Sequence, residues 1–582
     1  MINKIRKHRL FKKHWSSISS PAAKMMGFSV LVGAGVGGAA VLFRWLIGFF
    51  KIFFFQTVPH YLSFMGHYSV IFIPAMGAVL FSPLIYYFAR EAKGHGVPEV
   101  MDAMETNGGK IRPIVAVIKS IASSLCIGSG GSAGREGPVV QIGAALGSSL
   151  GQVFHLSEER IKNLVACGAA GGIAATFNAP IGGLFFALEV ILRDFSTRRI
   201  VNVIVASVTA SVVAKMFLGN ELFVKVPAYA IHSPVELLFY IGLGLVLVPF
   251  CVLFIKLLYG FEDYFEALKI HELYKPVIGA FLLGFIGLFF PQVFGVGYEN
   301  IVGALNAVMA FKLLLILIPL KFLAVCLTLG SGGSGGVFAP SLVLGALVGG
   351  AYGTVLSHVF PQMGIEPGAY ALVGMAAFFA GGARAPMTAF LIMFELTGDY
   401  LIILPLMLAV VITTVVSERV HPESIYTLKL VRRGINLNKE MIRDILESIR
   451  VKDILGKETS SVRPSASIDE ITSVVEKENR GTITVVDGEG VFRGIITLGE
   501  IITLLKNKDT LMHLIVAEDL VKEVPCLEES ESLKEALSKF VESGSDVLPV
   551  LRGVEDKKKL VGVILKHDIL SAYRREMAVR KG

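Results

Sequence analysis

The feature that most constrains the fold is a glycine-rich stretch that occurs twice in the chain. Residues 128–138 read Gly-Ser-Gly-Gly-Ser-Ala-Gly-Arg-Glu-Gly-Pro and lead into the apolar run 139–150. Residues 330–340 read Gly-Ser-Gly-Gly-Ser-Gly-Gly-Val-Phe-Ala-Pro and lead into the run 341–350. Both ends of the two copies lie 202 residues apart (330−128 and 340−138). The duplication predicts that about the first 430 residues consist of two related halves.

A second pair of landmarks supports this duplication. Phe-Asn-Ala-Pro at 177–180 precedes Glu189, and Ala-Arg-Ala-Pro at 383–386 precedes Glu395, at an offset of 206 (386−180 and 395−189). Short apolar segments interrupted by glycine and proline, at matching positions of two halves, indicate where a transporter binds its substrate. The run 164–192 carries several glycines, an asparagine and a proline, and therefore predicts a broken helix.

Each glycine-rich stretch has the chemistry of an anion site. Glycine lets the backbone approach a ligand closely, and proline suits the first turn of a helix. A helix that begins there presents unpaired N–H groups and the positive end of its dipole. Glu136 places a carboxylate in the first stretch, and an acid inside an apolar membrane protein indicates function. Ionised, Glu136 would occupy the anion site and block it; protonated, it would swing away.

The composition indicates a membrane protein with a soluble part. The 582 residues are 53% hydrophobic and 18% charged, with a mean hydropathy of +0.65, whereas soluble chains carry about 25% charged residues. Charged residues are scarce from about residue 24 to 420 and dense after 430. We therefore divide the chain into a basic cytoplasmic N-terminal helix (1–23), a transmembrane domain (24–436, with halves at about 24–218 and 235–430), a linker (437–450), and two small domains (451–510 and 511–577).

The net charge of +8 reflects membrane topology rather than nucleic-acid binding. Basic residues cluster at 5–14, before the first apolar run, and at Lys429, Arg432 and Arg433, after the last. Basic flanks mark cytoplasmic ends, so both termini are expected in the cytoplasm. The N-terminus has no compact apolar core with a cleavage site and is expected to be retained. Nucleic-acid binding lacks any reading motif.

Several apolar runs are too short to cross a membrane alone, since a helix needs about 20 residues to do so. Interrupted helices are tolerated where they are buried in protein or line a polar cavity. Gly33, Gly35, Gly37 and Gly38 in the first run predict close helix packing. The charged segment 260–274 predicts a loop. Helices are predicted over 25–55, 68–88, 114–127, 201–218, 237–259, 277–290, 313–329, 341–356, 371–380, 386–395 and 401–416.

The tail from about 450 to 575 has a repeat of its own. Ile-Thr-Val-Val at 483–486 leads to Gly-Ile-Ile-Thr-Leu-Gly-Glu at 494–500. Val-Leu-Pro-Val at 547–550 leads to Gly-Val-Ile-Leu-Lys-His-Asp at 562–568. Each unit reads helix, strand, turn, strand, helix. Two such units predict one compact α/β module of about 125 residues.

Catalysis is not expected. The first glycine-rich stretch lacks the Gly-Lys-Ser/Thr ending of a phosphate loop and the strand that precedes a dinucleotide site. No nucleophile set, metal cluster or carboxylate pair stands out, and the five cysteines show neither zinc nor disulfide spacing. Tight helix packing alone explains neither Glu136 nor the duplicated Ser-Gly-Gly-Ser. An anion pathway between two helix N-termini is the remaining interpretation, because partial charges bind an anion without trapping it.

The motifs resemble those of the CLC family of chloride channels and proton/chloride exchangers, over essentially the whole chain. The matching segments are Gly-His-Gly-Val-Pro at 94–98, Gly-Arg-Glu-Gly-Pro at 134–138, Asn-Ala-Pro at 178–180, Gly-Val-Phe-Ala-Pro at 336–340, Phe-Glu-Leu-Thr-Gly-Asp at 394–399 and Tyr426 in Ser-Ile-Tyr-Thr-Leu-Lys-Leu. The tail resembles a pair of CBS domains. The resemblance implies an all-α polytopic membrane domain of two inverted repeats of interrupted helices, followed by a soluble α/β CBS pair, in a homodimer with one pore per subunit.

The resemblance also implies roles for single residues. Glu136 would be the external gating glutamate, and the backbone N–H groups of Val337 and Phe338 with the Tyr426 hydroxyl would hold the central anion. The other implied anion-site residues are His95, Gly96, Arg135, Gly137 and Ala339. No metal or obligatory cofactor is implied. The CBS pair is a candidate adenine-nucleotide site with Thr497, Glu500 and Asp568, or else a packing and dimer module.

Two departures from the family pattern bear on function. The family's usual Gly-Ser-Gly-x-Pro has His95 in place of the serine, which leaves the anion selectivity open; His95 is either a packing histidine or an anion contact with pH dependence near neutrality. Val190 stands where exchangers commonly carry an internal proton-handling glutamate. We therefore predict a passive chloride channel regulated by the CBS pair. The alternative is a proton/chloride antiporter, while Tyr426 and the His95 turn do not resemble the fluoride-exporting branch.

Overall fold

The computed structural model describes residues 21–195, 197–219, 229, 233–398, 400–435, 446–456, 460–478, 482–506, 515–552 and 559–581. The chain divides into two units, Met1–Ile435 and Asn436–Gly582. Residues 1–20 of the predicted N-terminal helix, 437–445 of the predicted linker, and Asp399 of the last membrane motif lie outside the described residues.

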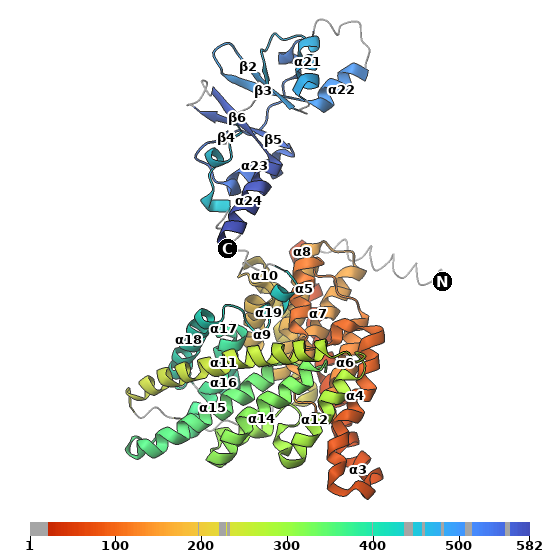
Figure 1. Ribbon diagram of the computed structural model, residues 1–582, viewed down its shortest axis with the longest axis vertical. Helices are drawn as coiled ribbons and strands as arrows, with labels where there is room; N and C mark the ends of the chain where they lie inside the picture. The colour runs from red at the N-terminus through yellow and green to blue at the C-terminus, as the bar shows by residue number, and fades with distance from the viewer. Residues whose placement is uncertain are drawn as a thin grey trace, which may run out of the picture. The chain divides into compact units, whose positions relative to one another are not determined.

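The first unit is built from helices (Figure 1). They are α2 (Pro21–Ile52), α3 (Val58–Tyr61), α4 (Ser69–Phe88), α5 (Val97–Thr106), α6 (Ile114–Gly128), α7 (Glu136–Val153), α8 (Glu158–Phe177), α9 (Pro180–Phe186), α10 (Thr197–Leu218), α11 (Glu236–Ala267), α12 (Lys275–Phe289), α13 (Tyr298–Leu305), α14 (Phe311–Gly330), α15 (Phe338–Val359), α16 (Pro367–Ala383), α17 (Pro386–Thr397), α18 (Ile403–Val420) and α19 (Thr427–Arg432). Among the described residues, seven helical segments are long and apolar enough to cross a membrane, and five apolar ones are shorter. The predicted mixture of full and short helices is confirmed.

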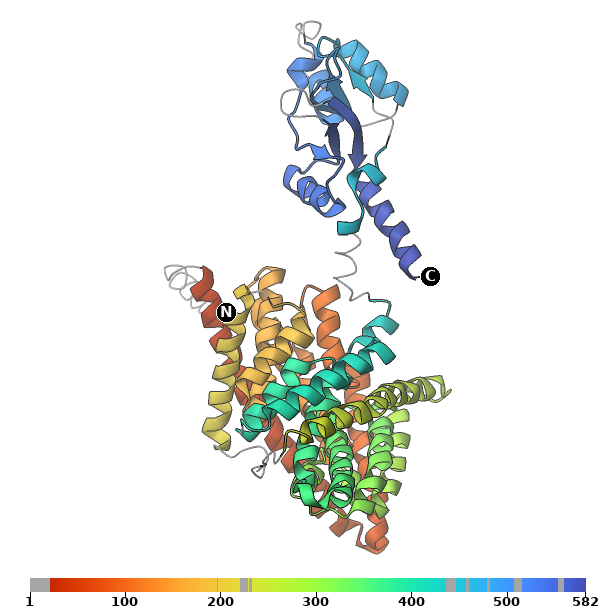
Figure 2. The ribbon, with the colours of Figure 1, turned by 90° about the vertical axis from the view of Figure 1, so that its left-hand side faces the viewer.

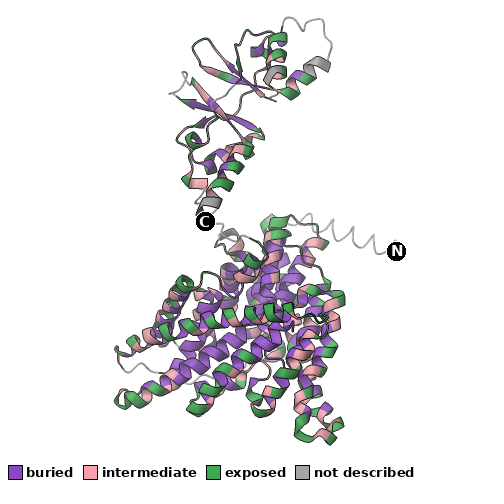
Figure 3. Cartoon of the chain, in the orientation of Figure 1, coloured by how far each residue is buried: buried purple, intermediate pink, exposed green. Residues whose placement is uncertain are grey.

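The helices leave two opposite faces of the unit. Figure 1 shows α3 at one end, which we call the α3 face, and α5 with α19 near the other, which we call the α19 face. Figure 2 shows the same helices from the side, with the first helices in red reaching from one end to the other. Figure 3 shows buried residues concentrated in the interior of the unit and exposed ones around its rim.

The predicted loop at 260–274 is wrong for its first half, because α11 continues to Ala267. Two of its acidic residues form ion pairs: Asp263 Oδ1 lies 2.7 Å from Arg432, and Glu262 Oε1 lies 3.4 Å from Lys429 Nζ. Phe265 is buried. Ion pairs with α19 and one apolar face therefore extend the helix. α11 packs against α14, α16 and α18 (Figure 1).

The predicted helix break at 164–192 is confirmed, and it occurs in both halves. Asn178 follows α8 in the left-handed region with φ of 57°, and Arg384 follows α16 with the same φ of 57°. The next helix starts with a proline in each case, which cannot continue a helix and pushes the residue before it out of the helical region. These two breaks are 206 residues apart (384−178).

Two carboxylates join the broken helices of the two halves reciprocally. Glu189 accepts hydrogen bonds from the backbone N–H groups of Met387 (2.9 Å) and Thr388 (2.7 Å) at the start of α17. Glu395 accepts hydrogen bonds from Ile181 N (2.9 Å) and Gly182 N (2.7 Å) at the start of α9. Each carboxylate satisfies unpaired donors and faces the positive end of a helix dipole. The duplicated glutamates are therefore helix caps that link the halves.

Glycines set the closest helix contacts, and they too are duplicated. A Cβ on Gly143 would collide with the carbonyl of Gly168 where α7 crosses α8. A Cβ on Gly345 would collide with the carbonyl of Gly374 where α15 crosses α16. The equivalent glycines of the two crossings are 202 and 206 residues apart (345−143 and 374−168), the same offsets as the sequence landmarks. Small residues at these crossings let the backbones pack directly.

The second unit contains two three-stranded sheets of the same design. In the first, β1 (Ser461–Val462), β2 (Thr482–Val486) and β3 (Phe492–Thr497) lie in this order; in the second, β4 (Leu527–Glu528), β5 (Val547–Arg552) and β6 (Lys559–Leu565) do. Each sheet pairs its first two strands in parallel and its last two antiparallel. The helices are α21 (Ile468–Glu478), α22 (Leu498–Lys506), α23 (Leu533–Ser543) and α24 (Lys566–Lys581). The predicted α/β repeat is confirmed.

The packing of α2 against α10 yields a test with a control two residues away. A Cβ on Gly33 would collide with the carbonyl of Ala206, whereas a Cβ on the exposed Gly35 would meet nothing within 4 Å. We expect Gly33→Ala to lower the melting temperature of the purified protein in detergent, because overpacking costs about 1–3 kcal/mol. Gly35→Ala should leave it unchanged or raise it, since alanine favours a helix by about 1 kcal/mol. Equal melting temperatures for the two variants would contradict this packing.

Candidate functional site

The two glycine-rich stretches meet at the centre of the first unit. Gly134 N donates to Gly336 O at 2.7 Å, and Gly336 N donates to Gly134 O at 2.6 Å. The partners are equivalent positions of the two halves (336−134 is 202), so the contact is reciprocal. A reciprocal contact between equivalent residues is what a twofold relation produces. It brings the first turns of α7 and α15 against each other, as the duplication predicted.

Glycine is required on both sides of this contact. A Cβ on Gly336 would lie 2.7 Å from the backbone nitrogen of Gly137, and a Cβ on Gly137 would lie 2.9 Å from the Cα of Gly336. Gly137 also adjoins the carbonyl of His95, where a Cβ would collide. Only residues without a Cβ let the two helix starts approach this closely. The free N–H groups of both helices are thereby directed towards one region.

Glu136 is fully buried at this junction. Its Oε1 accepts a hydrogen bond of 2.5 Å from the hydroxyl of Tyr298, the first residue of α13. Its Oε2 lies against Gly134, beside the backbone of Ala339 in the first turn of α15, and no hydrogen-bond donor among the described residues reaches this oxygen with good geometry. A buried carboxylate thus points from the start of α7 towards the start of α15.

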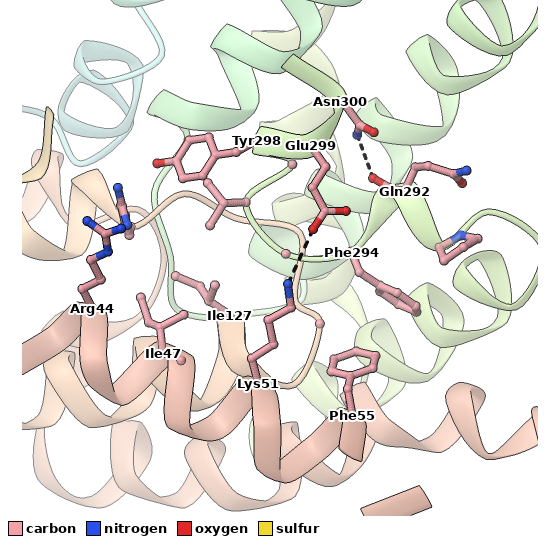
Figure 4. A pocket seen from close by; sticks show the side chains of 17 residues that line it. Arg44, Ile47, Lys51, Phe55, Ile127, Gln292, Phe294, Tyr298, Glu299 and Asn300 are labelled. Carbon is pink, nitrogen blue, oxygen red and sulfur yellow. Dashed lines mark hydrogen bonds and ion pairs between the residues drawn. The ribbon is translucent and has the colours of Figure 1, made fainter. Parts of the chain in front are cut away.

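A cavity of about 650 Å³ opens beside Tyr298 towards the α3 face (Figure 4). Figure 4 shows Arg44 and Lys51 of α2 facing Tyr298 and Glu299 across it, and Lys51 Nζ lies 3.7 Å from Glu299 Oε1. The guanidinium of Arg135 lines the same cavity and stands 5.1 Å over the ring of Tyr298. Three cations around one opening raise the local concentration of anions.

The His95 turn lies on the other side of the junction. Gly94 and Gly96 flank it with φ of 75° and 82°, which a residue with a side chain rarely adopts. The His95 side chain is 4% exposed, and its ring lies 6.1 Å from that of Tyr426 and 6.3 Å from that of Tyr259. The Tyr259 hydroxyl donates to Ile425 O at 2.7 Å. His95, Tyr259 and Tyr426 thus form an aromatic group around one point.

Two buried lysines hold the turns on either side of the junction, and they are equivalent (321−119 is 202). Lys119 Nζ donates to the carbonyls of Ala92 (2.9 Å) and Gly94 (2.8 Å). Lys321 Nζ donates to the carbonyls of Val293 (3.1 Å) and Gly295 (3.3 Å). Each ammonium therefore satisfies the backbone of a Gly-x-Gly turn, one carrying His95 and the other followed by Tyr298. A buried cation without such partners would be strongly unfavourable.

A second large cavity, of about 640 Å³, opens on the α19 face and is bounded by ion pairs. Lys429 lies 3.7 Å from Glu99 and 3.4 Å from Glu262, both of which are largely buried. Arg433 lies 2.6 Å from Glu99. Tyr259 lines this cavity as well as contacting His95. The cavity therefore ends at the aromatic group.

The predicted anion-site residues all lie around the junction, although their contacts differ. Gly137, Val337, Phe338 and Ala339 form the abutting helix starts, and Gly96 packs against the carbonyl of Gly137. Arg135 instead lines the cavity on the α3 face. Val190 is buried and offers no titratable atom. The sequence reasoning missed Tyr298, Tyr259, Lys119 and Lys321; the Gly-x-Gly turns at 94–96 and 295–297 and the lysine offset are the signals that could have revealed all but Tyr259.

The three residues predicted for a nucleotide lie in the second unit, in helix caps. Glu500 accepts hydrogen bonds from Thr497 N (2.8 Å) and Thr497 Oγ1 (3.0 Å). Asp568 accepts one from Leu565 N (2.9 Å). The two acids occupy equivalent positions at the starts of α22 and α24. Their nucleotide role stays a prediction. Within the described residues, no group of three or more metal-ligating side chains occurs.

The arrangement suits anion passage. Helix N-termini provide partial positive charge from two directions, and aromatic and hydroxyl groups complete the surroundings. A single buried carboxylate lies between this region and a basic cavity, where it can compete with an anion. The same carboxylate can carry a proton, so one group can respond to both ions.

Comparisons with known proteins give consistent matches. A family model described as "voltage gated chloride channel" matches residues 76–418, and a model of the CBS domain matches residues 451–507 and 516–575. The H(+)/Cl(-) exchange transporter ClcA of Vibrio vulnificus is 33% identical over 448 residues, which are 74% of this chain and 94% of the relative. A relative from Ralstonia nicotianae, named as a ClcB-like chloride channel protein, is 33% identical over 365 residues, covering 62% and 85% of the two chains.

Solved structures agree. A slow cyanobacterial Cl⁻/H⁺ antiporter matches with a TM-score of 0.65 and 25% identity, over 72% of this chain and 100% of that one. A eukaryotic CLC transporter matches with a TM-score of 0.62 and 22% identity, over 94% of this chain and 98% of that one. The second likeness concerns the fold alone.

The buried lysines yield a stability prediction. Lys321→Ala removes the donor of two buried carbonyls, and an unsatisfied buried acceptor costs about 1–3 kcal/mol. We expect the melting temperature in detergent to fall by about 5 °C or more. Lys312→Ala removes an exposed lysine from the same helix and should change it little. An unchanged melting temperature for Lys321→Ala would show that the turn before Tyr298 does not depend on this lysine.

Proposed function

Because the chain belongs to the family of voltage-gated chloride channels, the CLC family, we propose that it exchanges chloride for protons across a membrane, with Glu136 as the gate. The observation that carries the proposal is the buried Glu136 carboxylate, placed between the first turns of α7 and α15 and next to a basic cavity. A group that binds a proton and competes with chloride is what coupled exchange requires. The resemblance to CLC proteins predicted from the motifs is confirmed.

Exchange has better support than the passive channel that Val190 led us to predict. The relative from Vibrio vulnificus is named as an exchange transporter, and the cyanobacterial structure is that of an antiporter. The passive-channel prediction is not confirmed. The valine remains a real departure, so this chain has to take protons through another group on the α19 face.

The proposed cycle follows from competition at one site. In its ionised form Glu136 occupies the positive end of the facing helix and excludes chloride from it. A chloride that enters beside the carboxylate raises the affinity of Glu136 for a proton, because like charges disfavour the ionised form. Once protonated, Glu136 loses its attraction to the helix starts and swings out, and chloride passes. The Tyr298 hydroxyl stabilises the ionised, blocking position.

We further propose that the central chloride is held by the N–H groups of Val337 and Phe338 and by the Tyr426 hydroxyl. Tyr426 is buried beside His95 and lies close enough to Glu136 for the two to interact electrostatically. Binding by the partial charges of N–H and O–H groups is weak enough for release. A homodimer in the inner membrane of a prokaryote, with both termini cytoplasmic and a regulatory CBS pair, completes the proposal. The α19 face is then cytoplasmic.

Removing the gate tests the proposal. Glu136→Ala should still conduct chloride in proteoliposomes, but the flux should no longer depend on pH and should carry no protons, because the competing group is gone. The matched control is Glu299→Ala, which removes an exposed carboxylate at the mouth of the same cavity and should preserve coupling. If a well-folded Glu136→Ala protein conducted no chloride, or still moved protons against their gradient, the gate assignment would be wrong.

Tyr298→Phe tests what holds the gate shut. Losing a hydrogen bond to a charged group costs about 1.5–3 kcal/mol, and this cost falls on the blocking state. Chloride turnover at neutral pH should therefore rise, by about tenfold or more. Tyr61→Phe, which alters an exposed tyrosine, serves as the control. Unchanged turnover in Tyr298→Phe would mean that the hydrogen bond to Glu136 does not limit opening.

A further inference from the structure

We infer that His95 is the internal proton relay of this exchanger, reached from the α19 face through Tyr259. The inference rests on the proposed function, since only a proton-coupled protein needs such a group. It assigns proton transfer to the histidine of the Gly-His-Gly turn, because position 190 has no acid that could carry it out. Four observations carry it: the engagement of Glu189, the unpartnered ring nitrogen of His95, the cavity that ends at Tyr259, and the route onward past Tyr426.

Glu189, the acid next to position 190, is engaged in the hydrogen bonds that cap α17. Val190 is 4% exposed and has no group that binds a proton. Glu189 accepts three hydrogen bonds, from Met387 N, Thr388 N and the Thr388 hydroxyl at 2.6 Å, at the start of α17. Its equivalent Glu395 makes the same kind of cap in the other half. A carboxylate that holds the two halves together is poorly suited to releasing its partners in every cycle.

His95 has the properties that a relay needs. Histidine changes its charge close to neutral pH. The side chain is buried, and no partner among the described residues reaches its Nδ1. Buried polar atoms in proteins nearly always have a partner, so this nitrogen is available to a ligand or a proton. Its Nε2 lies 3.4 Å from the Tyr259 hydroxyl, which itself donates to Ile425 O.

Tyr259 lies between His95 and the cavity on the α19 face. It lines the cavity of about 640 Å³ together with Glu99, Glu262 and Glu266. Glu99 and Glu262 are also paired with Lys429 there. The tyrosine ring is 1% exposed, so it separates the cavity from the interior while its hydroxyl faces His95. A proton therefore has a carboxylate-lined entrance and one hydroxyl between the cavity and the imidazole.

The surroundings of His95 couple its proton to chloride. Burial disfavours a lasting imidazolium, and repulsion by Lys429, Lys119 and Arg433 adds to this, although Lys429 and Arg433 are also paired with Glu99. Tyr259 and Tyr426 face the same ring. A chloride at the Tyr426 hydroxyl compensates that repulsion, so the proton enters while chloride is bound. The ring therefore holds its proton only transiently.

The transfer conserves protons. Water in the cavity gives one proton to the hydroxyl oxygen of Tyr259 as that hydroxyl gives its own proton to Nε2 of His95, so that each new bond forms as an O–H bond breaks. The imidazolium then loses one proton, past Tyr426 and through water, to the carboxylate of Glu136. His95 returns to its neutral form, and nothing is consumed. The same steps run in reverse when the proton gradient is reversed.

The test compares chloride and proton flux in proteoliposomes that hold the purified full-length protein. His95→Ser keeps a hydrogen-bonding side chain at the turn but cannot carry a proton. We expect the ratio of its proton flux to its chloride flux to fall by about tenfold or more. His358→Ser changes an exposed histidine of the same unit and should preserve both fluxes. Melting temperatures establish that the variants are folded, and His95→Gln replaces His95→Ser if the latter is not.

The possible outcomes distinguish a failure of the proposed relay from a failure of the proposed exchange function. Loss of proton flux with chloride flux retained supports the relay. An unchanged ratio of protons to chloride in the variant overturns it, and so does an equal loss of both fluxes, which would make His95 an anion contact or a structural residue. If the unsubstituted protein moves no protons under a chloride gradient, the proposed exchange itself fails, and that result needs no variant.

Discussion

The reciprocal hydrogen bonds between Gly134 and Gly336 are the contact on which the rest of the site depends. They hold the first turns of α7 and α15 against each other, so that the free N–H groups of two helices serve one region instead of two. Neither helix end could satisfy these donors inside a membrane without polar surroundings. The glycines at 134, 137 and 336 permit the approach, and the caps from Glu189 and Glu395 fix the halves farther out.

The frame is symmetric, but the residues that carry function are not. The buried lysines, the helix breaks, the capping glutamates and the helix crossings recur in both halves. By the offsets of 202 and 201, Glu136 is matched by Phe338, Tyr298 by Val97, and His95 by Val296. Each of these titratable side chains therefore has an apolar residue at the equivalent position of the other half. Symmetry provides the two abutting helix starts, and its local loss places Glu136, the proposed gate, on one face and His95 on the other.

Much of this could be predicted from the sequence, because the decisive features are local. The glycine-rich stretches, the broken helices and Glu136 can be recognised from composition and spacing, and their offsets revealed the two halves. The extension of α11 to Ala267 could not be predicted from the sequence. Its acidic residues pair with α19, which is far away in the chain. The partners of Glu136 and His95 escaped for the same reason: Tyr298 and Tyr259 reach them only through the fold. Val190 favoured the passive-channel prediction. The absence of an acid at this position does not show which other group carries protons.

The central claim is that chloride and protons share one gated path. The most direct measurement is proton movement into or out of proteoliposomes that hold the unsubstituted protein, under a chloride gradient and with the voltage clamped near zero by an ionophore. The account predicts that protons move against their own gradient, driven by chloride flowing in the opposite direction. Chloride flux without any uphill proton movement would contradict it and would leave Glu136 as the gate of a passive channel.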